Sequence, residues 1–279
     1  MRLDYPIIDL HTHLRNEIPT HSKIASDCGI DLVVYMANAN PVLDNLEDIH
    51  ESTSQPRSCI ALPVSAITKG LEGRELVDIH GIRDYVVGFS DDGKYLYDLK
   101  LLEEVLDTGV LVMAHCSPNY NAGVINPDLE TKYIKRYLEV LKQTGGALHI
   151  QHVSKKDSVI AIREAKEEGL KLTCETCPHY FTFTASELNV KVNPPLGNIE
   201  DVQAIRAGLK DKTIDVIASD YAPEPRETGI AGFRAFLPLS YGLVSSKVLT
   251  EEELREKLYL NPSDIINANA GKLMYERMD

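Results

Sequence analysis

Short apolar segments alternate with helical segments along the whole chain, and this alternation limits the folds that the chain can adopt. Eight of them are predicted to be strands, near Ile7–Leu10, Leu32–Met36, Cys59–Ser65, Tyr85–Phe89, Val110–His115, Ala147–Val153, Lys171–Thr176 and Asp215–Ser219. Their apolar residues are continuous rather than alternating, which is typical of a parallel sheet covered by helices. Eight strand–helix units in 279 residues favour a closed barrel over an open doubly wound sheet. The sequence therefore predicts an α/β protein, a (β/α)8 TIM barrel that forms a single domain over residues 1–279.

The segments between these strands have helical character. It is clearest at Tyr97–Asp107, Leu129–Gln143, Lys155–Glu168 and Ile199–Leu209, and residues 251–279 are expected to form terminal helices. The first strand carries no G-x-G-x-x-G motif, and the chain has no Walker A sequence. The sequence therefore lacks the main motifs that would indicate a nucleotide-binding fold.

Charge and composition exclude several classes of partner. The formal net charge is -13 and no block of lysine and arginine stands out, so we expect neither nucleic-acid nor membrane-surface binding. No apolar run approaches the roughly 20 residues of a membrane helix. The first strand follows Met1 closely, with no secretory signal before it, and the five cysteines fit reduced thiols. We expect a cytoplasmic protein that acts on a small molecule.

Ionisable residues stand where several predicted strands end, which is the edge at which parallel barrels build their sites. The first strand runs into Asp9-Leu10-His11-Thr12-His13, and a strand period of two places Asp9, His11 and His13 on one side. Two imidazoles would then converge on the barrel axis. A histidine in an ordinary hydrogen-bond network is the simpler interpretation of one H-x-H motif, so the pair gains its weight from the later strands.

Those later strands add further ligand-type side chains at the same edge. The fifth predicted strand ends at His115 and the eighth at Asp220, a carboxylate that is costly there unless it is paired or bound to a metal. His149 and His152 on the sixth cannot share a face; we favour His152 as the ligand and His149 as a packed structural histidine. Asp91-Asp92-Gly93 after the fourth strand would alone indicate a turn, but beside four histidines the doublet is a candidate bridge between two cations.

Imidazole and carboxylate are suitable ligands for Zn²⁺ and similar ions, so we expect one or two divalent metal ions per chain. Such ions activate water at neutral pH and polarise a carbonyl group. A carboxylate such as Asp220 can carry the proton from the water to a leaving nitrogen. The residues alone predict metal-assisted hydrolysis of a carbonyl substrate.

Seven segments together resemble the dihydroorotases of the amidohydrolase superfamily. They are Asp9-Leu-His11-Thr-His13-Leu-Arg15, Met36-Ala-Asn38-Ala-Asn40-Pro41, His115-Cys116, Gln151-His152-Val153-Ser154, Cys177-Pro178-His179-Tyr180, Val192-Asn193-Pro194-Pro195-Leu196 and Ile217-Ala-Ser-Asp220. The resemblance covers essentially the whole chain in order. It implies reversible hydrolysis of dihydroorotate to N-carbamoyl-L-aspartate in pyrimidine biosynthesis. It also implies the branch in which an aspartate replaces the carboxylated lysine that bridges the metals in other members.

The resemblance implies a metal-binding set of His11, His13, Asp92, His115, His152 and Asp220. The first two histidines would hold one metal and the other two the second. Asp92 is the favoured bridge, with Asp91 as the next choice, and Asp220 would be both ligand and proton shuttle.

The resemblance also implies a substrate-binding set. Arg15 and Asn38 would hold the substrate carboxylate, for which the planar fork of arginine is well suited. Asn193 would contact the pyrimidine ring, and His179 matches a position near the site that is not a metal ligand.

Three features depart from the family pattern. The last motif usually continues Asp-His-Ala-Pro-His, whereas this chain has Asp220-Tyr221-Ala222-Pro223-Glu224, and Glu224 would repel a substrate carboxylate unless it points away or is protonated. The loop that follows is short and reaches Gly229 within a few residues. Relatives also carry a small β-sandwich built from both chain ends, for which this chain has no room. We expect a partner, either aspartate transcarbamoylase or a second copy in a homo-oligomer, to cover the barrel surface left bare.

Two other functions stay open. An allantoinase or hydantoinase type of cyclic amidase normally uses a carboxylated lysine, which the fourth predicted strand does not offer. A non-catalytic scaffold for aspartate transcarbamoylase would explain Tyr221, Glu224 and the short loop, but it has no reason to keep six ligands. Cys174 and Cys177 are interpreted as ordinary strand residues, and His21, His50 and His80 as solvated histidines without partners.

Overall fold

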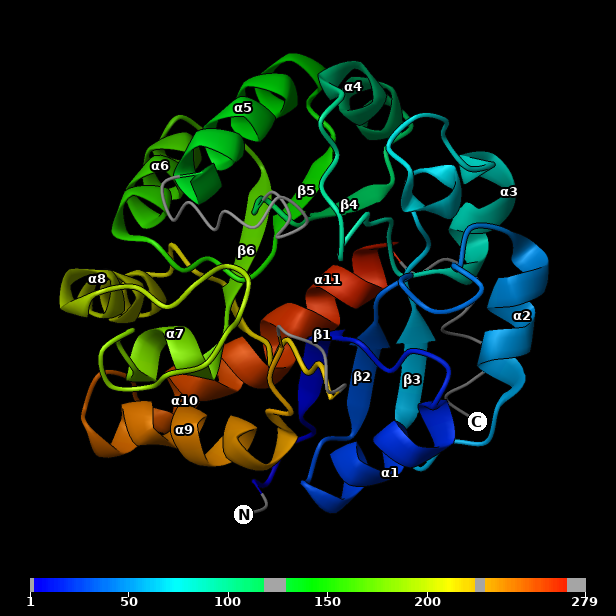
Figure 1. Cartoon of the computed structure of the whole chain (residues 1–279). Helices are drawn as coiled ribbons and strands as arrows, with labels where there is room; N and C mark the ends of the chain where they lie inside the picture. Colours follow the sequence, from blue (N-terminus) through cyan, green and yellow to red (C-terminus); the bar gives the residue numbers. More distant parts are fainter. Residues whose placement is uncertain (1–2, 118–128, 224–228, 270–279) are drawn as a thin grey trace.

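The structure, a computed structural model, describes residues 3–117, 129–223 and 229–269 (Figure 1). Its strands are β1 (Ile8–Thr12), β2 (Leu32–Tyr35), β3 (Ile60–Pro63), β4 (Leu111–Ala114), β5 (Ala147–Ile150), β6 (Leu172–Thr176) and β7 (Val216–Ile217). The longer helices are α1 (Ile18–Asp27), α2 (Leu46–Ser54), α4 (Leu99–Asp107), α5 (Leu129–Thr144), α6 (Lys156–Glu167), α8 (Ile199–Lys210), α9 (Phe233–Ser245) and α11 (Asn261–Asn269). Shorter helical segments are η1 (Lys69–Leu71), α3 (Ile79–Ile82), η2 (Arg83–Tyr85), α7 (Pro178–Thr182), α10 (Glu251–Arg255) and the π-helical turn η4 (Glu256–Leu260).

The strands form a closed parallel barrel surrounded by helices (Figure 1). β1, β2 and β3 pair in parallel, as do β4, β5, β6 and β7. Residues 87–90 fill the gap between β3 and β4: Val87 N donates to Pro63 O (2.9 Å), and Phe89 N donates to Leu111 O (2.9 Å). On the other side, His13 N donates to Tyr221 O (2.8 Å) and joins β1 to the residues after β7. The predicted TIM barrel is confirmed.

The fourth barrel strand is shorter than the predicted segment Tyr85–Phe89. Arg83–Tyr85 forms the 3₁₀ turn η2, so the extended backbone begins only after it. Gly88 lies so close to β4 that a Cβ atom there would come within 2.8 Å of the carbonyl oxygen of Leu111. The absence of a side chain therefore lets this short segment reach its neighbour.

Strand β1 contains a β-bulge that the sequence does not reveal. Asp9 pairs with Val33 and Thr12 with Tyr35, so three steps along β1 match two along β2. A bulge of this kind breaks the period of two and re-aims the following side chains. Asp9 therefore lies on the side of Val33, whereas His11 and His13 face the barrel interior with Glu175 and Asp220. The prediction that Asp9 shares one face with both histidines is wrong.

Two apolar layers hold the barrel together. One lies between strands and surrounding helices, and the other fills the barrel from the end where the strands begin. Ile265 and Ile266 of α11 pack in this second layer with Ile8, Leu10 and Val216. Helix α11 thus closes one end of the barrel and leaves the other end for the polar site.

The helices largely follow the predicted segments. Helices α4, α5, α6 and α8 begin and end within a few residues of the predicted bounds, and the expected terminal helices are α10, η4 and α11 as far as residue 269. Within the three described ranges, no helix combines the length and the apolar character needed to cross a membrane.

Candidate active site

Six ligand-type side chains from five segments of the sequence meet at the open end of the barrel. They are His11, His13, Asp92, His115, His152 and Asp220. His11 Nε2 lies 2.7 Å from Asp92 Oδ2, and His13 Nε2 lies 3.1 Å from Asp220 Oδ1. His115 Nδ1 lies 3.4 Å from Asp92 Oδ1 and 2.7 Å from His152 Nε2. Asp92 is thus central to the cluster and within 3.9 Å of each of the four histidines.

The two adjacent aspartates at positions 91 and 92 have different surroundings. Asp91 Oδ1 accepts hydrogen bonds from Ile67 N (2.9 Å) and Thr68 N (3.0 Å), and its Oδ2 accepts one from the Thr68 hydroxyl (2.6 Å). Those bonds occupy Asp91 with the loop after β3. The geometry places Asp92, and not Asp91, among the histidines.

The carboxylates of the cluster attract a positive charge: burial lowers the pKa of His11, but Asp92, Glu175 and Asp220 outweigh it and raise that pKa well above its usual value. Burial lowers the pKa of His152 to about 3 and also lowers the pKa of His115, so both rings are neutral at pH 7. Burial raises the pKa of Asp220, but the nearby His11 and His13 outweigh it and bring it to about 2. Neutral imidazoles and ionised carboxylates are the forms that bind metal ions, so a bound cation would take the place of the proton that the carboxylates favour on His11.

The residues present fit a metal centre by a second criterion. His11 Nε2 and Asp92 Oδ2 are buried, and neither has a well-aligned hydrogen bond among the described residues. Their mutual contact at 2.7 Å therefore leaves both atoms without a satisfied hydrogen bond, which is costly in a buried site unless something else binds them. Two three-residue groups, His11 with Asp92 and His152 and His11 with His13 and Asp220, have donor atoms within 4.8 Å of one another. A divalent ion would satisfy these atoms.

Two of the clustered residues have unusual backbone conformations. His152 has φ 36° and Asp220 has φ 50°, both in the left-handed region that non-glycine residues rarely adopt. Such conformations cost of order 1–3 kcal/mol each and persist only where the surroundings hold them. The contacts that hold these two backbone conformations therefore also fix the positions of His152 and Asp220 in the site.

Glu175 on β6 is a residue that the sequence interpretation missed. Its buried carboxylate lies 2.6 Å from His11 Nδ1 and 3.1 Å from His149 Nε2. When one ring nitrogen of a histidine binds a metal, a carboxylate bonded to the other nitrogen fixes the orientation of the ring. Here Glu175 occupies Nδ1 of His11 and leaves Nε2 for the cluster. His149 packs inside the barrel, with Nδ1 2.8 Å from the hydroxyl of Thr173. The missed signal was a carboxylate in the middle of an otherwise buried strand.

Glu130 on α5 supports the loop that carries His152. Its Oε1 accepts hydrogen bonds from Ser154 N (3.0 Å) and Lys155 N (3.2 Å), at the start of α6. Helix N-termini leave such N–H groups without intrahelical partners, and a carboxylate there also interacts favourably with the helix dipole. Glu130 therefore fixes the chain immediately after His152.

Glu130→Ala is expected to lower the free energy of unfolding by about 2 kcal/mol, because two buried N–H groups lose their acceptor. Denaturant unfolding of the purified variant measures this change. Glu139→Ala is the matched control: Glu139 lies on the same helix, is exposed, and should change the stability by no more than about 0.5 kcal/mol. Equal losses in the two variants would contradict the structural role of Glu130.

Arg15 and Asn38 lie beside His13. Arg15 Nη1 donates to the carbonyl oxygen of Asn38 (2.8 Å), and Asn38 Oδ1 lies 2.9 Å from His13 Nδ1. A Cβ atom at Gly93 would lie 2.6 Å from Asn38 Nδ2, so only glycine allows this amide its place. The two predicted substrate-binding residues are therefore coupled to the cluster through His13.

Asn193 lies on the opposite side of the cluster, beside His115. Its Oδ1 accepts a hydrogen bond from Ser117 Oγ (2.8 Å), and its Nδ2 lies 3.2 Å from His115 Nε2. His179 is buried in the first turn of α7 and packs on Tyr180, with 4.1 Å between ring centroids. Burial lowers the pKa of His179 to about 4.

The residues that depart from the family pattern are only partly described. Tyr221 is buried and turned toward α1, where its hydroxyl lies 3.0 Å from His21 Nδ1. The prediction that His21 is solvated and without a partner is therefore wrong. His50 and His80 are exposed as predicted, but His50 has a partner, since its ring meets that of Tyr85 edge to face with centroids 5.1 Å apart. The expectation for Glu224 concerns a position outside the described residues.

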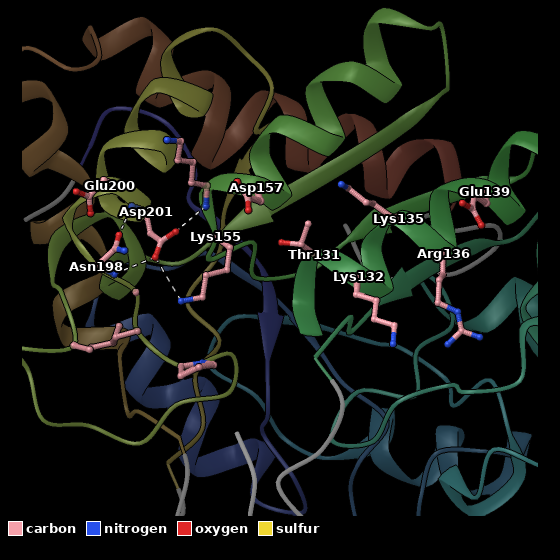
Figure 2. A pocket seen from close by; sticks show the side chains of 15 residues that line it. Thr131, Lys132, Lys135, Arg136, Glu139, Lys155, Asp157, Asn198, Glu200 and Asp201 are labelled. Atoms are coloured by element: carbon pink, nitrogen blue, oxygen red, sulfur yellow. Dashed lines mark hydrogen bonds and ion pairs between the residues drawn. The ribbon is translucent and has the colours of Figure 1, made fainter. Parts of the chain in front are cut away.

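A groove of about 1220 Å³ is lined by residues outside the cluster (Figure 2). It is lined by α5, by the start of α6 and by the start of α8, and none of the six clustered residues contributes to it. Asp201 accepts hydrogen bonds there from Lys156 N (2.9 Å) and Asn198 N (3.0 Å) and pairs with Lys155 Nζ at 3.5 Å (Figure 2). Lysines and carboxylates both line the groove, so its charge selects no class of ligand.

Comparison with curated proteins finds extensive similarity to dihydroorotases. The dihydroorotase of Trichlorobacter lovleyi is 34% identical over an alignment 313 residues long, which covers 96% of this chain and 74% of that protein. The dihydroorotase of Aquifex aeolicus is 34% identical over 310 residues, covering 95% of this chain and 74% of that protein. No family model matches the chain.

Solved structures share the barrel. The L-hydantoinase (dihydropyrimidinase) from Arthrobacter aurescens has a TM-score of 0.81 and 22% identity, with 94% of this chain and 70% of that chain covered. The inactive dihydroorotase-like domain of the Chaetomium thermophilum CAD-like multifunctional protein has a TM-score of 0.70 and 16% identity, with 94% and 79% covered. At these identities the similarity establishes the fold.

Proposed function

The chain belongs to the dihydroorotase family of metal-dependent cyclic amidohydrolases, and we propose that it interconverts dihydroorotate and N-carbamoyl-L-aspartate in the cytoplasmic synthesis of pyrimidines. The observation that carries this proposal is the convergence of four histidines on Asp92, with Asp220 at the edge of the cluster. The hydantoinases that share the fold are less than 25% identical, so they do not set the substrate.

The site is proposed to hold two zinc ions. His11 and His13 would hold one ion, His115 and His152 the other, and Asp92 would bridge them. Bound divalent ions supply Lewis acidity, which activates water and polarises the amide carbonyl. Glu175 keeps Nε2 of His11 directed at the cluster through its bond to Nδ1.

Asp220 is proposed to move the proton. It is 13% exposed, whereas Asp92 is 4% exposed, so of the two carboxylates Asp220 is the more open to substrate. In the hydrolytic direction its ionised carboxylate takes a proton from the attacking water and delivers it to the leaving ring nitrogen. In the cyclising direction it takes the proton from the carbamoyl nitrogen that attacks the substrate's side-chain carboxyl group, and delivers it to the oxygen that leaves this group as water.

Arg15, Asn38 and Asn193 are proposed to bind the substrate from two sides of the cluster. The Arg15 guanidinium would pair with the carboxylate of dihydroorotate, since its planar fork matches a carboxylate. Its bond to the Asn38 carbonyl holds the side chain beside His13. Asn193, fixed by Ser117, would contact the ring from the side of His115.

The experiment that tests this proposal joins metal content with turnover. The purified chain is loaded with Zn²⁺, its metal is counted by mass spectrometry, and the ultraviolet absorbance of dihydroorotate is followed in both directions. We expect turnover that disappears on chelation and returns with Zn²⁺. Hydantoin and allantoin serve as comparison substrates.

Full metal content without dihydroorotate turnover, alone or mixed with aspartate transcarbamoylase, would overturn the proposed reaction. Turnover of hydantoin or allantoin instead would favour the other cyclic amidases. A chain that binds no metal and only associates with the transcarbamoylase would be a scaffold. Size-exclusion chromatography of the same samples tests the proposed partners, which are the transcarbamoylase or a second copy.

A further inference from the structure

Tyr221 follows Asp220 directly and is anchored away from the metal-binding cluster. Its hydroxyl lies 3.0 Å from Nδ1 of His21 on α1. Its ring stacks on Phe233 at the start of α9, with centroids 3.6 Å apart and planes 3° from parallel. Burial raises the pKa of Tyr221 to about 12, so the hydroxyl keeps its proton at neutral pH. Two helices therefore hold this side chain.

The backbone of Tyr221 joins β1, the first strand of the barrel, to the segment that follows β7, the last strand. Its carbonyl oxygen accepts a hydrogen bond from His13 N (2.8 Å), and its N–H donates to Ser219 Oγ (3.1 Å). Thr12 and Tyr221 pair in parallel at this seam. Any shift of Tyr221 would therefore move the backbone next to both His13 and Asp220.

Asp220 depends on support from its neighbours. Its φ of 50° is a left-handed conformation that an aspartate with a relaxed backbone seldom adopts. On one side, Ser219 N is held by Asp9 Oδ1 (2.9 Å). On the other side stands the anchored Tyr221. Between them, Asp220 Oδ1 lies 3.1 Å from His13 Nε2.

We propose that Tyr221, together with His21 and Phe233, is a positioning unit that holds Asp220 in its left-handed conformation and its carboxylate against His13. The inference rests on the proposed function, because it assigns the unit to the proton-carrying residue of that reaction. A displacement of a reacting group by 1 Å can cost as much as a hundredfold in rate.

Tyr221→Phe is the main test, because it keeps the ring that stacks on Phe233 and removes only the hydroxyl that meets His21. We expect kcat for dihydroorotate to fall about tenfold with KM within about twofold of the unchanged chain. The number of zinc ions bound at saturation should not change. The zinc affinity, measured by competition with a chelator, should fall about tenfold, because Asp220 is also a ligand.

Two further variants separate positioning from packing. Tyr137→Phe removes another buried hydroxyl, which donates to Leu96 O (2.9 Å) in the segment before α4, and should lower the melting temperature while kcat and zinc affinity stay unchanged. His21→Leu removes the same bond as Tyr221→Phe from the other side. The effects of His21→Leu and Tyr221→Phe on kcat should therefore be non-additive in the double variant.

The proposal is overturned if Tyr221→Phe lowers only the melting temperature and leaves kcat and zinc affinity as they were. Additive effects of the two single substitutions would overturn it as well. If Tyr221→Phe does not fold, His21→Leu alone gives the same comparison with Tyr137→Phe. If the unchanged chain has no dihydroorotate turnover, the proposed function fails, and zinc affinity still decides whether Tyr221 positions Asp220.

Discussion

Asp220→Asn is expected to lower kcat for dihydroorotate by about a thousandfold or more, because an amide cannot take a proton from water. The amide oxygen can still face His13, whose Nε2 now lies 3.1 Å from Asp220 Oδ1, so the fold should be kept. Steady-state kinetics at saturating Zn²⁺ measure the loss. Circular dichroism and thermal unfolding verify that the variant is folded.

Asp215→Asn is the matched control for this prediction. Asp215 lies just before β7, at the opposite end of the same barrel strand, where its Oδ2 accepts hydrogen bonds from Lys166 Nζ (2.6 Å) and Cys174 N (2.8 Å). Its substitution should lower stability and leave kcat nearly unchanged. Near-normal turnover by Asp220→Asn would refute its role as proton carrier.

Asp92→Asn is expected to abolish turnover for a different reason, which is loss of bound metal. Asp92 is the carboxylate that lies within 3.9 Å of all four histidines, and an amide offers a neutral, weaker ligand in its place. We expect the zinc content per chain to fall, and turnover to fall below about a thousandth of the unchanged value. Mass spectrometry of the metal and steady-state kinetics measure the two effects.

Asp91→Asn provides an adjacent control of the same chemistry. Its carboxylate is bonded to Ile67, Thr68 and no histidine among the described residues, so the substitution should cost about 1–3 kcal/mol of stability and keep the full metal content. The opposite pattern, with metal lost from Asp91→Asn and kept in Asp92→Asn, would assign the bridge to Asp91.

The barrel could be predicted because its signal is repeated eight times, as an apolar run that ends in polar residues before the next helix. Two local features carry no such signal. The bulge in β1 adds one residue to a strand in which Leu10 and Asp9 are both fully buried, so composition does not show where the period of two breaks. The short strand at residues 87–90 is held by bonds to β3 and β4, which depend on tertiary contacts.

That the six ligand-type side chains lie together could be predicted, because parallel strands bring their carboxyl ends to one edge. The choice between Asp91 and Asp92 could not, because the loop after β3 supplies the N–H groups that bind Asp91. The contact of Glu175 with His11 and that of Tyr221 with His21 could not be predicted for a similar reason. Their partners, His11 and His21, lie far away in the sequence, and no local pattern connects them.

Because of helix α11, the two ends of the barrel have different roles. Ile265 and Ile266 pack in the apolar layer where the strands begin, so among the described residues the polar cluster lies toward the opposite end of the barrel. The packing of α11 at one end of the barrel can stay the same while residues around the polar site at the other end change. New specificities could therefore be selected at the site without changes in this core.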